Sequence, residues 1–328
     1  MNVLQKIAAL FFVGLFVLMA ALPSVASAAQ QDEYVFILKA KGNPYWTAMA
    51  DGIKETAKAK GIKATVYQTE TDRDAEGEIT TCMTAIQRKP KVLVMAAVNP
   101  SVAVQCFKQA SAVGIMVADV DANISVEDAQ KAGIKLAFSA GSDNFLIGQE
   151  AGKFSAKLLN IPKPKIFILE GAVGNIPGKK RVDGFRTKFQ ELAPNVEIVA
   201  SISAEWDRLK AMNMTTDLLQ RQPDIDLIYA ANDTMALGAA EAVRNSGKGT
   251  GIKIIGVDGT GDARKAILDG RLTASVAQLP YLMGMRATEL AIEAAQQSKT
   301  GLTEIIPTPV LTKESITAKT DPLLQYVR

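Results

Sequence analysis

Residues 227–238, LIYAANDTMALG, decide the fold: an apolar run ends on Asn232 and Asp233, and a helical pattern follows at once. The same design returns in altered form at IKIIGVDGTGDA, where the apolar run ends on Asp258, and at IMVADVDAN, which leads to Asp121. Ligands of open parallel sheets lie outside the carboxyl ends of the strands. Three strands that deliver Asp or Asn to that edge therefore predict a polar site for an uncharged ligand.

Apolar, β-rich runs alternate with amphipathic helical patterns along the chain. The first series predicts strands over 34–40, 64–70, 91–98, 115–121 and 136–139, and helices over 45–60, 75–88, 101–113 and 144–159. The second series predicts strands over 165–171, 196–204, 227–233 and 252–258, and helices over 177–192, 207–221 and 234–246. This alternation is typical of parallel sheets covered by helices. The predicted fold class is α/β, with two Rossmann-like, doubly wound parallel-sheet lobes joined by a hinge.

No Pro- or Ser-rich linker separates the two series, and the crossover near residues 140–144 is short. The late strand LTASVAQL, residues 272–279, indicates a second crossing, and weaker signals near residues 307–312 indicate a third. The predicted limits are a signal peptide over 1–28, an N-terminal lobe over 29–142 plus 279–310, and a C-terminal lobe over 143–278 plus 311–328. Lobes joined in this way are expected to close on a trapped ligand.

The first residues are typical of an export signal. Lys6 supplies a positive start, residues 7–22 are apolar, and residues 26–28, ASA, have the small-x-small pattern of a cleavage site. A membrane anchor is the alternative, but an apolar stretch of about 16 residues is short for a span of about 20. The cleavage site also lacks the Cys of a lipid anchor. The sequence therefore predicts export, and a Gram-negative periplasm fits best.

The bulk composition is that of an ordinary globular protein, with 48% hydrophobic and 22% charged residues. About 300 residues would remain after cleavage, which is enough for two domains with good cores. The formal net charge is +3, and basic residues are interleaved with acidic ones. No nucleic acid or other polyanion is therefore expected as a partner. We expect a monomer.

The chain has two cysteines, Cys82 and Cys106, each several residues into a predicted helix. The two helices follow consecutive strands, so a doubly wound sheet would place them side by side. A disulfide would then be favoured in an oxidising compartment. Two separately buried thiols are the alternative, and the sequence leaves both open.

Four residues, NPYW, follow the first predicted strand and open the first helix. Asn43 is a candidate N-cap, and Pro44 occupies the favoured first helical position. Tyr45 and Trp46 are either core residues or part of a binding wall, because the tip of a first strand lies at the crevice. Aromatic faces can lie flat against the C–H side of a sugar ring.

Lys39 stands at the end of the same strand. A lysine in an otherwise apolar strand is costly unless it is paired, and Asp121 is the candidate partner. The pair is either structural or a place where Lys39 donates to ligand oxygens. A charged hydrogen bond of that kind contributes about 1.5–3 kcal/mol.

Trp206, in SAEWDRLKAM, stands where a strand passes into a helix that Asp207 caps. Trp46 and Trp206 are the two tryptophans of the chain, and each falls at a strand-to-helix junction, one in each lobe. Trp206 is either a core residue or, with Trp46, one side of a sandwich around a flat ring.

The sequence gives little support for a catalytic motif. The chain has no His, which removes the commonest general base and metal ligand. Gly259-Thr260-Gly261 follows a strand but lacks the third glycine of a dinucleotide site. Asp121 and Asp258 could in principle form a hydrolytic pair, but neighbouring amides and cations that would hold both ionised argue against it. We expect a protein that is not an enzyme and has neither cofactor nor metal.

Several tracts together resemble a known family: NPYWTAM, AEWDRLKAMNM, YAANDTMALGAAEAV, GVDGTGDARKAI and ASVAQLP. They are similar to the type I periplasmic sugar-binding proteins of ABC importers, and specifically to the ribose and allose binders. The resemblance covers essentially the whole mature chain. It implies two Rossmann-like lobes, three hinge crossings and no catalysis.

The resemblance implies a ligand site with contacts from both lobes and the hinge. Its wall and hinge contacts are implied to be Asn43, Tyr45, Trp46, Trp206, Asn232, Asp258 and Gln278. Asp121 looks like the carboxylate that grips two ring hydroxyls. Lys39 stands where allose binders, unlike ribose binders, have a lysine, which favours a hexose-sized or otherwise different polyol over ribose.

The tract GNIPGKKR departs from the family pattern, because Lys179 stands where ribose binders have an arginine. A lysine cannot offer the bidentate fork of a guanidinium. Asn175 is predicted to share this task.

The expected function is capture of a monosaccharide or related polyol and its delivery to an ABC permease in the inner membrane. Lys39 and Lys179 against Asp121 and Asp258 would give two cations and two anions, a balance that suits a neutral ligand. Two alternatives stay open. In one, the chain binds a polyol or furanose-like signal molecule for a chemoreceptor or sensor kinase. In the other, it is the sensor core of a LacI-type repressor, against which the export segment argues.

Overall fold

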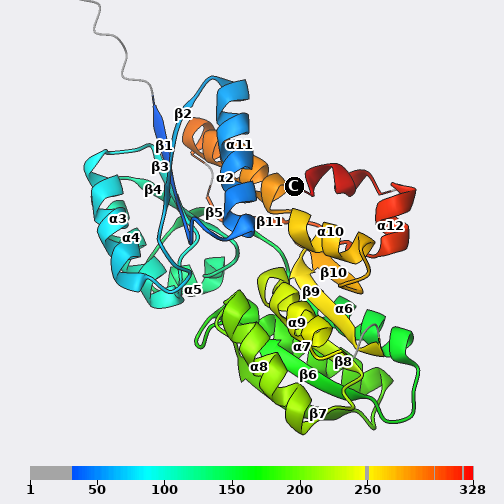
Figure 1. The fold of residues 1–328 in the computed structure, drawn as a ribbon. Helices are drawn as coiled ribbons and strands as arrows, with labels where there is room; N and C mark the ends of the chain where they lie inside the picture. Colours follow the sequence, from blue (N-terminus) through cyan, green and yellow to red (C-terminus); the bar gives the residue numbers. More distant parts are fainter. Residues whose placement is uncertain (1–31, 248–250, 299, 320, 328) are drawn as a thin grey trace, which may run out of the picture. The chain divides into compact units, whose positions relative to one another are not determined.

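Two six-stranded sheets organise the chain (Figure 1). The computed structural model describes residues 32–247, 251–298, 300–319 and 321–327, so the predicted signal peptide over 1–28 lies outside the described residues. The strands of the first sheet are β1 (Glu33–Leu38), β2 (Lys63–Gln68), β3 (Val92–Met95), β4 (Met116–Val120), β5 (Leu136–Gly141) and β11 (Leu302–Ile305). Those of the second are β6 (Lys165–Glu170), β7 (Glu197–Ser203), β8 (Leu227–Ala230), β9 (Lys253–Asp258), β10 (Ala274–Ala277) and β12 (Val310–Leu311).

Both sheets have the strand order of a doubly wound fold: β11-β5-β4-β3-β1-β2 and β12-β10-β9-β8-β6-β7. All neighbouring strands pair in parallel except β10 and β12, which are antiparallel. The central strands are buried along their whole length, as in VLVM of β3 and LIYA of β8. Continuous apolar strands of this kind are expected where helices cover both faces of a sheet. The predicted fold class is confirmed.

Helices cover the sheets on both faces. In the first lobe, defined as the first sheet with its helices, these are α2 (Pro44–Lys60), α3 (Ala75–Gln87), α4 (Pro100–Ala112), α5 (Val126–Lys131) and α11 (Pro280–Gln297). In the second lobe, defined likewise, they are α6 (Asn144–Leu159), α7 (Ile176–Leu192), α8 (Arg208–Arg221), α9 (Asp233–Asn245) and α10 (Gly261–Leu268). The chain ends with α12 (Lys313–Ala318) and the 3₁₀ helix η2 (Pro322–Tyr326). No helix among the described residues is long and apolar enough to cross a membrane.

The side chains of β1 show how one strand supplies two cores. Phe36 and Leu38 join the apolar cluster that includes Met49 of α2, whereas Val35 and Ile37 join a second cluster with residues of α3 and α4. Successive side chains of a strand point to opposite faces, so alternate residues serve opposite helical layers. In Figure 1, α2 and α11 accordingly lie on one side of the first sheet and α3 and α4 on the other.

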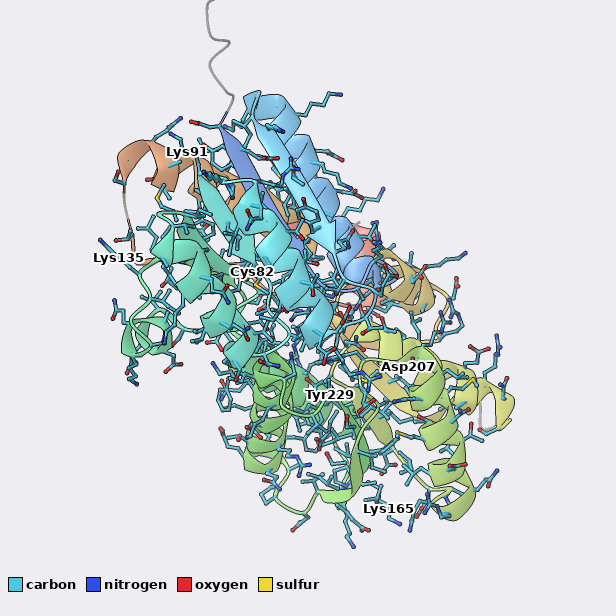
Figure 2. All side chains as sticks on the ribbon, turned by 90° about the vertical axis from the view of Figure 1, so that its left-hand side faces the viewer. Cys82, Lys91, Lys135, Lys165, Asp207 and Tyr229 are labelled. Atoms are coloured by element: carbon cyan, nitrogen blue, oxygen red, sulfur yellow. A yellow bond between two sulfur atoms is a disulfide. The ribbon has the colours of Figure 1, made fainter. Side chains whose placement is uncertain are left out.

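Cys82 and Cys106 form a disulfide with a Cα–Cα distance of 6.0 Å, so the alternative of two separate thiols is wrong. Cys82 is labelled in Figure 2. The bridge joins α3 to α4, which pack side by side, as two helices after consecutive strands should. Closing a loop of 24 residues stabilises the fold by about 3 kcal/mol in the chain-entropy model.

The chain passes between the two sheets three times. It leaves β5 and enters α6, which packs on α7 of the second lobe. It leaves β10 and enters α11, which packs on α2 of the first lobe. It passes last from β11 to β12. Within LTASVAQL, β10 belongs to the second sheet, and the passage follows it at Gln278 and Leu279.

The domain limits inferred from the sequence stay a prediction, although one strand bears on them. Val310 of β12 pairs with Val276 of β10. At this crossing, the second sheet therefore begins one residue before the predicted limit at 310/311.

Candidate functional site

A small cavity, partly open to solvent, lies between the carboxyl ends of the two sheets. Its lining takes residues from both lobes and from the crossings: Lys39, Asn43, Tyr45, Trp46, Asp72, Asp121, Asn175, Pro177, Arg181, Trp206, Asn232, Asp258 and Gln278. Every ligand-binding residue predicted from the sequence lies there except Lys179. Asp72, Pro177 and Arg181 were not predicted.

Three asparagines of the lining also begin helices. Asn43 accepts a hydrogen bond from the backbone N–H of Tyr45, Asn175 from that of Gly178, and Asn232 from that of Met235. An N-cap side chain satisfies one of the free N–H groups of the first helical turn. Capping therefore holds each amide where a strand gives way to a helix, at the edge of the cavity.

Asp72 holds the wall of the first lobe in place. Its Oδ1 accepts from Trp46 Nε1 at 2.6 Å, and its Oδ2 accepts from Asn43 Nδ2 at 3.1 Å. Asp121 directly follows β4, whereas Asp72 lies further into the connection after β2, which ends at Gln68. A search for polar residues over the whole connection, rather than at the strand exit alone, could have found it. Both of its oxygens are engaged by residues of the wall.

Lys39 and Asp121 form the ion pair predicted from the sequence. Lys39 Nζ lies 3.5 Å from Asp121 Oδ2, and both side chains are about 95% buried. The ammonium also donates to Asn123 Oδ1 at 3.2 Å and lies 4.9 Å from the centroid of the Trp46 ring. Tyr45 Oη donates to Asp121 Oδ1 at 2.8 Å. Burial raises the pKa of Tyr45 well above its ordinary value, and the nearby carboxylates add to this, so its hydroxyl stays a donor.

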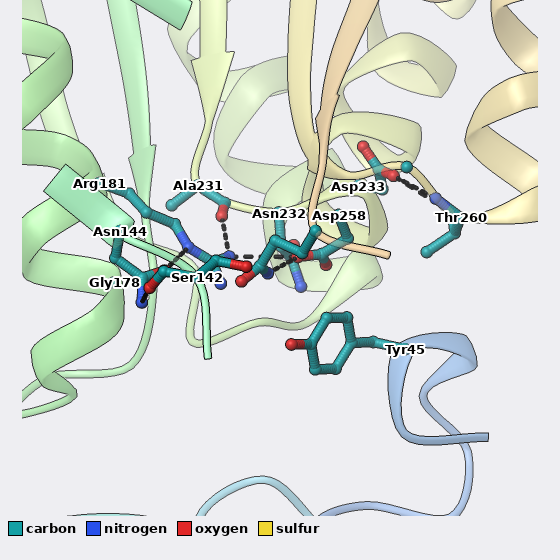
Figure 3. A network of polar contacts seen from close by, with 12 residues as sticks. Tyr45, Ser142, Asn144, Gly178, Arg181, Ala231, Asn232, Asp233, Asp258 and Thr260 are labelled. Carbon is teal, nitrogen blue, oxygen red and sulfur yellow. Dashed lines mark hydrogen bonds and ion pairs between the residues drawn. The ribbon is translucent and has the colours of Figure 1, made fainter. Parts of the chain in front are cut away.

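Arg181 is the cation that lines the cavity from the second lobe (Figure 3). Its Nη1 donates to Asp258 Oδ1 at 3.2 Å and to the carbonyl oxygen of Ala231 at 2.8 Å. Its Nε donates to Asn144 Oδ1 at 2.8 Å. Asp258 Oδ1 also accepts from Gln278 Nε2 at 2.6 Å. Burial raises the pKa of Asp258, while the Arg181 guanidinium opposes this shift.

The interpretation that placed Lys179 in this site is wrong. The Lys179 side chain is 76% exposed and pairs with Asp183 one turn later. An α-helix turns by about 100° per residue, so residues two apart point to nearly opposite sides. Arg181 therefore faces the cavity while Lys179 faces solvent. The buried positions of α7 include Pro177, Gly178 and Arg181, and this periodicity was the signal that could have identified the arginine.

Asp233, which ends the strand run of the opening motif beside Asn232, points away from the cavity. It is fully buried and accepts from the backbone N–H of Thr260 at 2.8 Å and from Ser275 Oγ at 2.7 Å. Burial raises the pKa of Asp233, and these donors oppose the shift. Figure 3 shows Asp233 beside Thr260. Asp233 thus braces the turn after β9, and Asn232 alone of the two reaches the cavity.

Trp206 lines the cavity from the second lobe, and Trp46 lines it from the first. Its indole lies 5.7 Å from the Arg181 guanidinium carbon, measured to the ring centroid. The ring also rests on two glycines: a Cβ on Gly171 would lie 2.1 Å from an indole carbon, and one on Gly178 would lie 2.8 Å away. Both tryptophans therefore border the cavity, and the absence of side chains at these glycines makes room for one of them.

Replacing Gly171 with alanine is expected to weaken ligand binding about 10-fold or more while leaving the fold intact. The added methyl would displace the indole, a half-buried side chain that can yield without moving the backbone. Displacement of an aromatic wall removes contact area and alters its geometry. Calorimetric titration measures the affinity, and thermal unfolding measures the stability. The control is Gly42→Ala, since a Cβ there meets nothing within 4 Å. Equal affinities of the two variants would contradict this role of Gly171.

The charges of the cavity are nearly balanced. Lys39 and Arg181 face Asp121 and Asp258, and Asp72 is the additional carboxylate. Arg181 thus replaces Lys179 in the predicted pattern of two cations and two anions. Among the described residues, no group of three or more His, Cys, Asp or Glu side chains could hold a metal ion.

Gln278 carries an unused acceptor. Its Oε1 is buried and has no hydrogen-bond partner among the described residues, although its Nε2 is bonded to Asp258. Buried polar atoms nearly always have a partner, so an orphan beside a cavity indicates a place for a donor such as a hydroxyl group. The arrangement as a whole offers fixed donors and acceptors between aromatic faces, with no activated nucleophile.

Comparison with known proteins finds a match over most of the chain. Residues 34–299 match the model of the periplasmic binding protein domain. The D-allose-binding periplasmic protein of Escherichia coli K12 is 33% identical over 273 residues, which cover 83% of this chain and 88% of that protein. The ribose import binding protein of Bacillus subtilis 168 is 32% identical over 272 residues, covering 83% and 84%.

A solved structure shares the fold. It is a periplasmic solute-binding protein of an ABC transporter from Actinobacillus succinogenes 130z, with bound D-allose. It is 30% identical, has a TM-score of 0.82, and the alignment covers 88% of this chain and all of that one.

Proposed function

The chain belongs to the family of periplasmic binding proteins, as the sequence resemblance predicted. On this premise, we propose that it captures a monosaccharide between its two lobes and delivers it to an ABC permease. The sugar leaves chemically unchanged. The family is one of transport proteins rather than enzymes.

One observation supports a sugar above other neutral ligands: two buried ion pairs, one in each lobe, meet at one cavity. Each pair presents carboxylate oxygens as acceptors and Nζ or Nη groups as donors, a combination that suits vicinal hydroxyls. Trp46 and Trp206 add flat apolar faces for the C–H side of a ring. A missing or inverted hydroxyl would leave a buried group without a partner, which is how such a site would read stereochemistry.

An allose-like hexose is the first candidate ligand, and a ribose-like pentose is the second. The relatives at 33% and 32% identity are named for allose and ribose respectively, and the solved structure holds D-allose. Lys39 supports the hexose, since the resemblance places a lysine here in allose binders. Its ammonium lies within the cavity lining, where it can donate to a hydroxyl.

We place its action in the periplasm, because the family is that of periplasmic binding proteins and the Escherichia coli relative is named as a periplasmic protein. Export by cleavage after residue 28 is part of the proposal, as is a permease in the inner membrane as the partner. The role in signalling through a chemoreceptor or sensor kinase stays a prediction.

A thermal-shift screen of pentoses, hexoses and alditols tests the proposal. A ligand at about 100 times its Kd should stabilise the protein by about 2.7 kcal/mol, a shift of several degrees in Tm. D-allose is expected to give the largest shift, with D-ribose smaller. Sucrose at the same concentration is the control, because an excluded osmolyte also stabilises proteins without binding. The proposal is wrong if no sugar or polyol exceeds that control, or if any sugar is converted to another compound during incubation.

A further inference from the structure

An ion pair joins the two lobes beside the cavity. Arg73 lies in the connection between β2 and α3 of the first lobe, and Glu205 lies in the connection between β7 and α8 of the second. Arg73 Nη1 donates to Glu205 Oε2. The Arg73 side chain is 50% exposed and that of Glu205 is 26% exposed, so the pair sits at the rim of the cleft.

The turn that carries Glu205 is strained. Glu205 and Trp206 are consecutive non-glycine residues with positive φ, 55° and 66°. Such residues cost about 1–2 kcal/mol each and persist where surrounding contacts hold them. The contacts on Glu205 are ion pairs with Arg73 and Lys210. Lys210 lowers the pKa of the Glu205 carboxyl and Arg73 adds to this, so the carboxylate is ionised at neutral pH.

Asp72, the residue before Arg73, contacts Trp46, the tryptophan of the first lobe. Asp72 accepts hydrogen bonds from Trp46 and Asn43, as described above. Arg73 forms its ion pair with Glu205, the residue before Trp206. Two consecutive residues of one connection therefore contact both aromatic walls, one directly and one through Glu205. The connection itself is anchored at its far end, where Asp74 caps α3 and accepts from the backbone N–H of Gly77.

We propose that Arg73 and Glu205 form a latch between the lobes that positions Trp206 against the ligand and slows release of the bound sugar. Arg73 and Glu205 are positioning residues, because the latch acts through Trp206. The effect on release rests on the proposed function, whereas the effect on Trp206 does not.

Sugar release tests the latch first. Release of D-allose and D-ribose is followed by stopped-flow fluorescence, and Arg73→Met is expected to speed it about two- to five-fold at low salt, the range for a single exposed ion pair. The increase should disappear near 1 M salt, where the screening length is about 3 Å. Arg73→Lys keeps the charge and should restore part of the slow release. Arg244→Met is the matched control: it removes an exposed ion pair with Glu241 that lies within the second lobe and does not involve Glu205, and release should be unchanged.

Trp206 fluorescence without sugar tests the latch independently of ligand identity. In a Trp46→Phe background, Trp206 is the one tryptophan of the chain. Adding Arg73→Met is expected to shift its emission maximum at low salt and not at high salt, whereas Arg244→Met leaves it unchanged. The latch is overturned if Arg73→Met and Arg244→Met behave alike in emission or in release. Failure of both sugars to bind the wild-type protein would contradict the proposed ligands. The Trp206 emission measured without sugar would then still test the latch.

Discussion

Replacing Arg181 with methionine is expected to lower the free energy of unfolding by about 3–5 kcal/mol and to weaken sugar binding about 100-fold or more. The variant leaves Asp258 buried without its cation and removes the donors to Asn144 and to the carbonyl of Ala231. A buried charge that loses its partner keeps the full cost of desolvation. Urea unfolding and calorimetric titration measure the two losses.

The pH dependence of this variant identifies the cause of its instability. Arg181 opposes the burial that raises the pKa of Asp258, so its loss raises that pKa further. A carboxyl whose folded pKa lies above its unfolded value binds protons more tightly when folded, and its contribution to stability is lost as pH rises through the folded pKa. The deficit relative to wild type should therefore be larger at about pH 8.5 than at about pH 5.5.

Lys179→Met is the matched control for Arg181. It makes the same substitution two residues earlier in the same helix, at a side chain that is 76% exposed. Its effect on stability should stay within about 0.5 kcal/mol, and sugar affinity should not change. If Lys179→Met weakens binding as much as Arg181→Met does, the second-lobe site described above is misassigned.

Asp121→Asn is expected to cost about 3 kcal/mol of stability and to weaken sugar binding about 100-fold. The substitution keeps the shape of the side chain but removes the charge that faces Lys39, whose ammonium is buried. Backbone strain is not added, because φ is 75° at this position and asparagine tolerates the left-handed region. Urea unfolding and calorimetry again separate the two effects.

Asp119→Asn provides the comparison for Asp121. Asp119 lies two residues earlier, in β4, is fully buried, and is outside the cavity lining. Burial raises the pKa of Asp119 well above its ordinary value, so a neutral amide resembles the form that the fold favours. We expect a loss of about 1 kcal/mol or less and unchanged affinity. Equal loss of binding in both variants would mean that Asp121 acts on the fold rather than on the ligand.

The sequence was sufficient for the elements that repeat a simple period. The strand patterns around LIYAAND and KVLVMAAV predicted β8 and β3. Asn232 was found as a polar residue at a strand exit, and Asn43 was found as a cap next to the helix that it begins. Short elements were not predicted: α5 has six residues, too few to show a helical period. The helices α10, α11 and α12 also have no counterpart among the predicted helices.

The sequence by itself determined the alternation of strands and helices, the family, and the polar strand exits at Asp121 and Asp258. All of these depend on residue patterns within about ten residues of chain, or on the order of motifs along it. The tertiary structure alone decided that Arg181 rather than Lys179 faces Asp258, that Cys82 joins Cys106, and that Arg73 reaches Glu205. These pairs join segments that are distant along the chain, and local patterns cannot specify which distant side chain completes a charge or a bond. Only the packing of the helices on the two sheets fixes those distances.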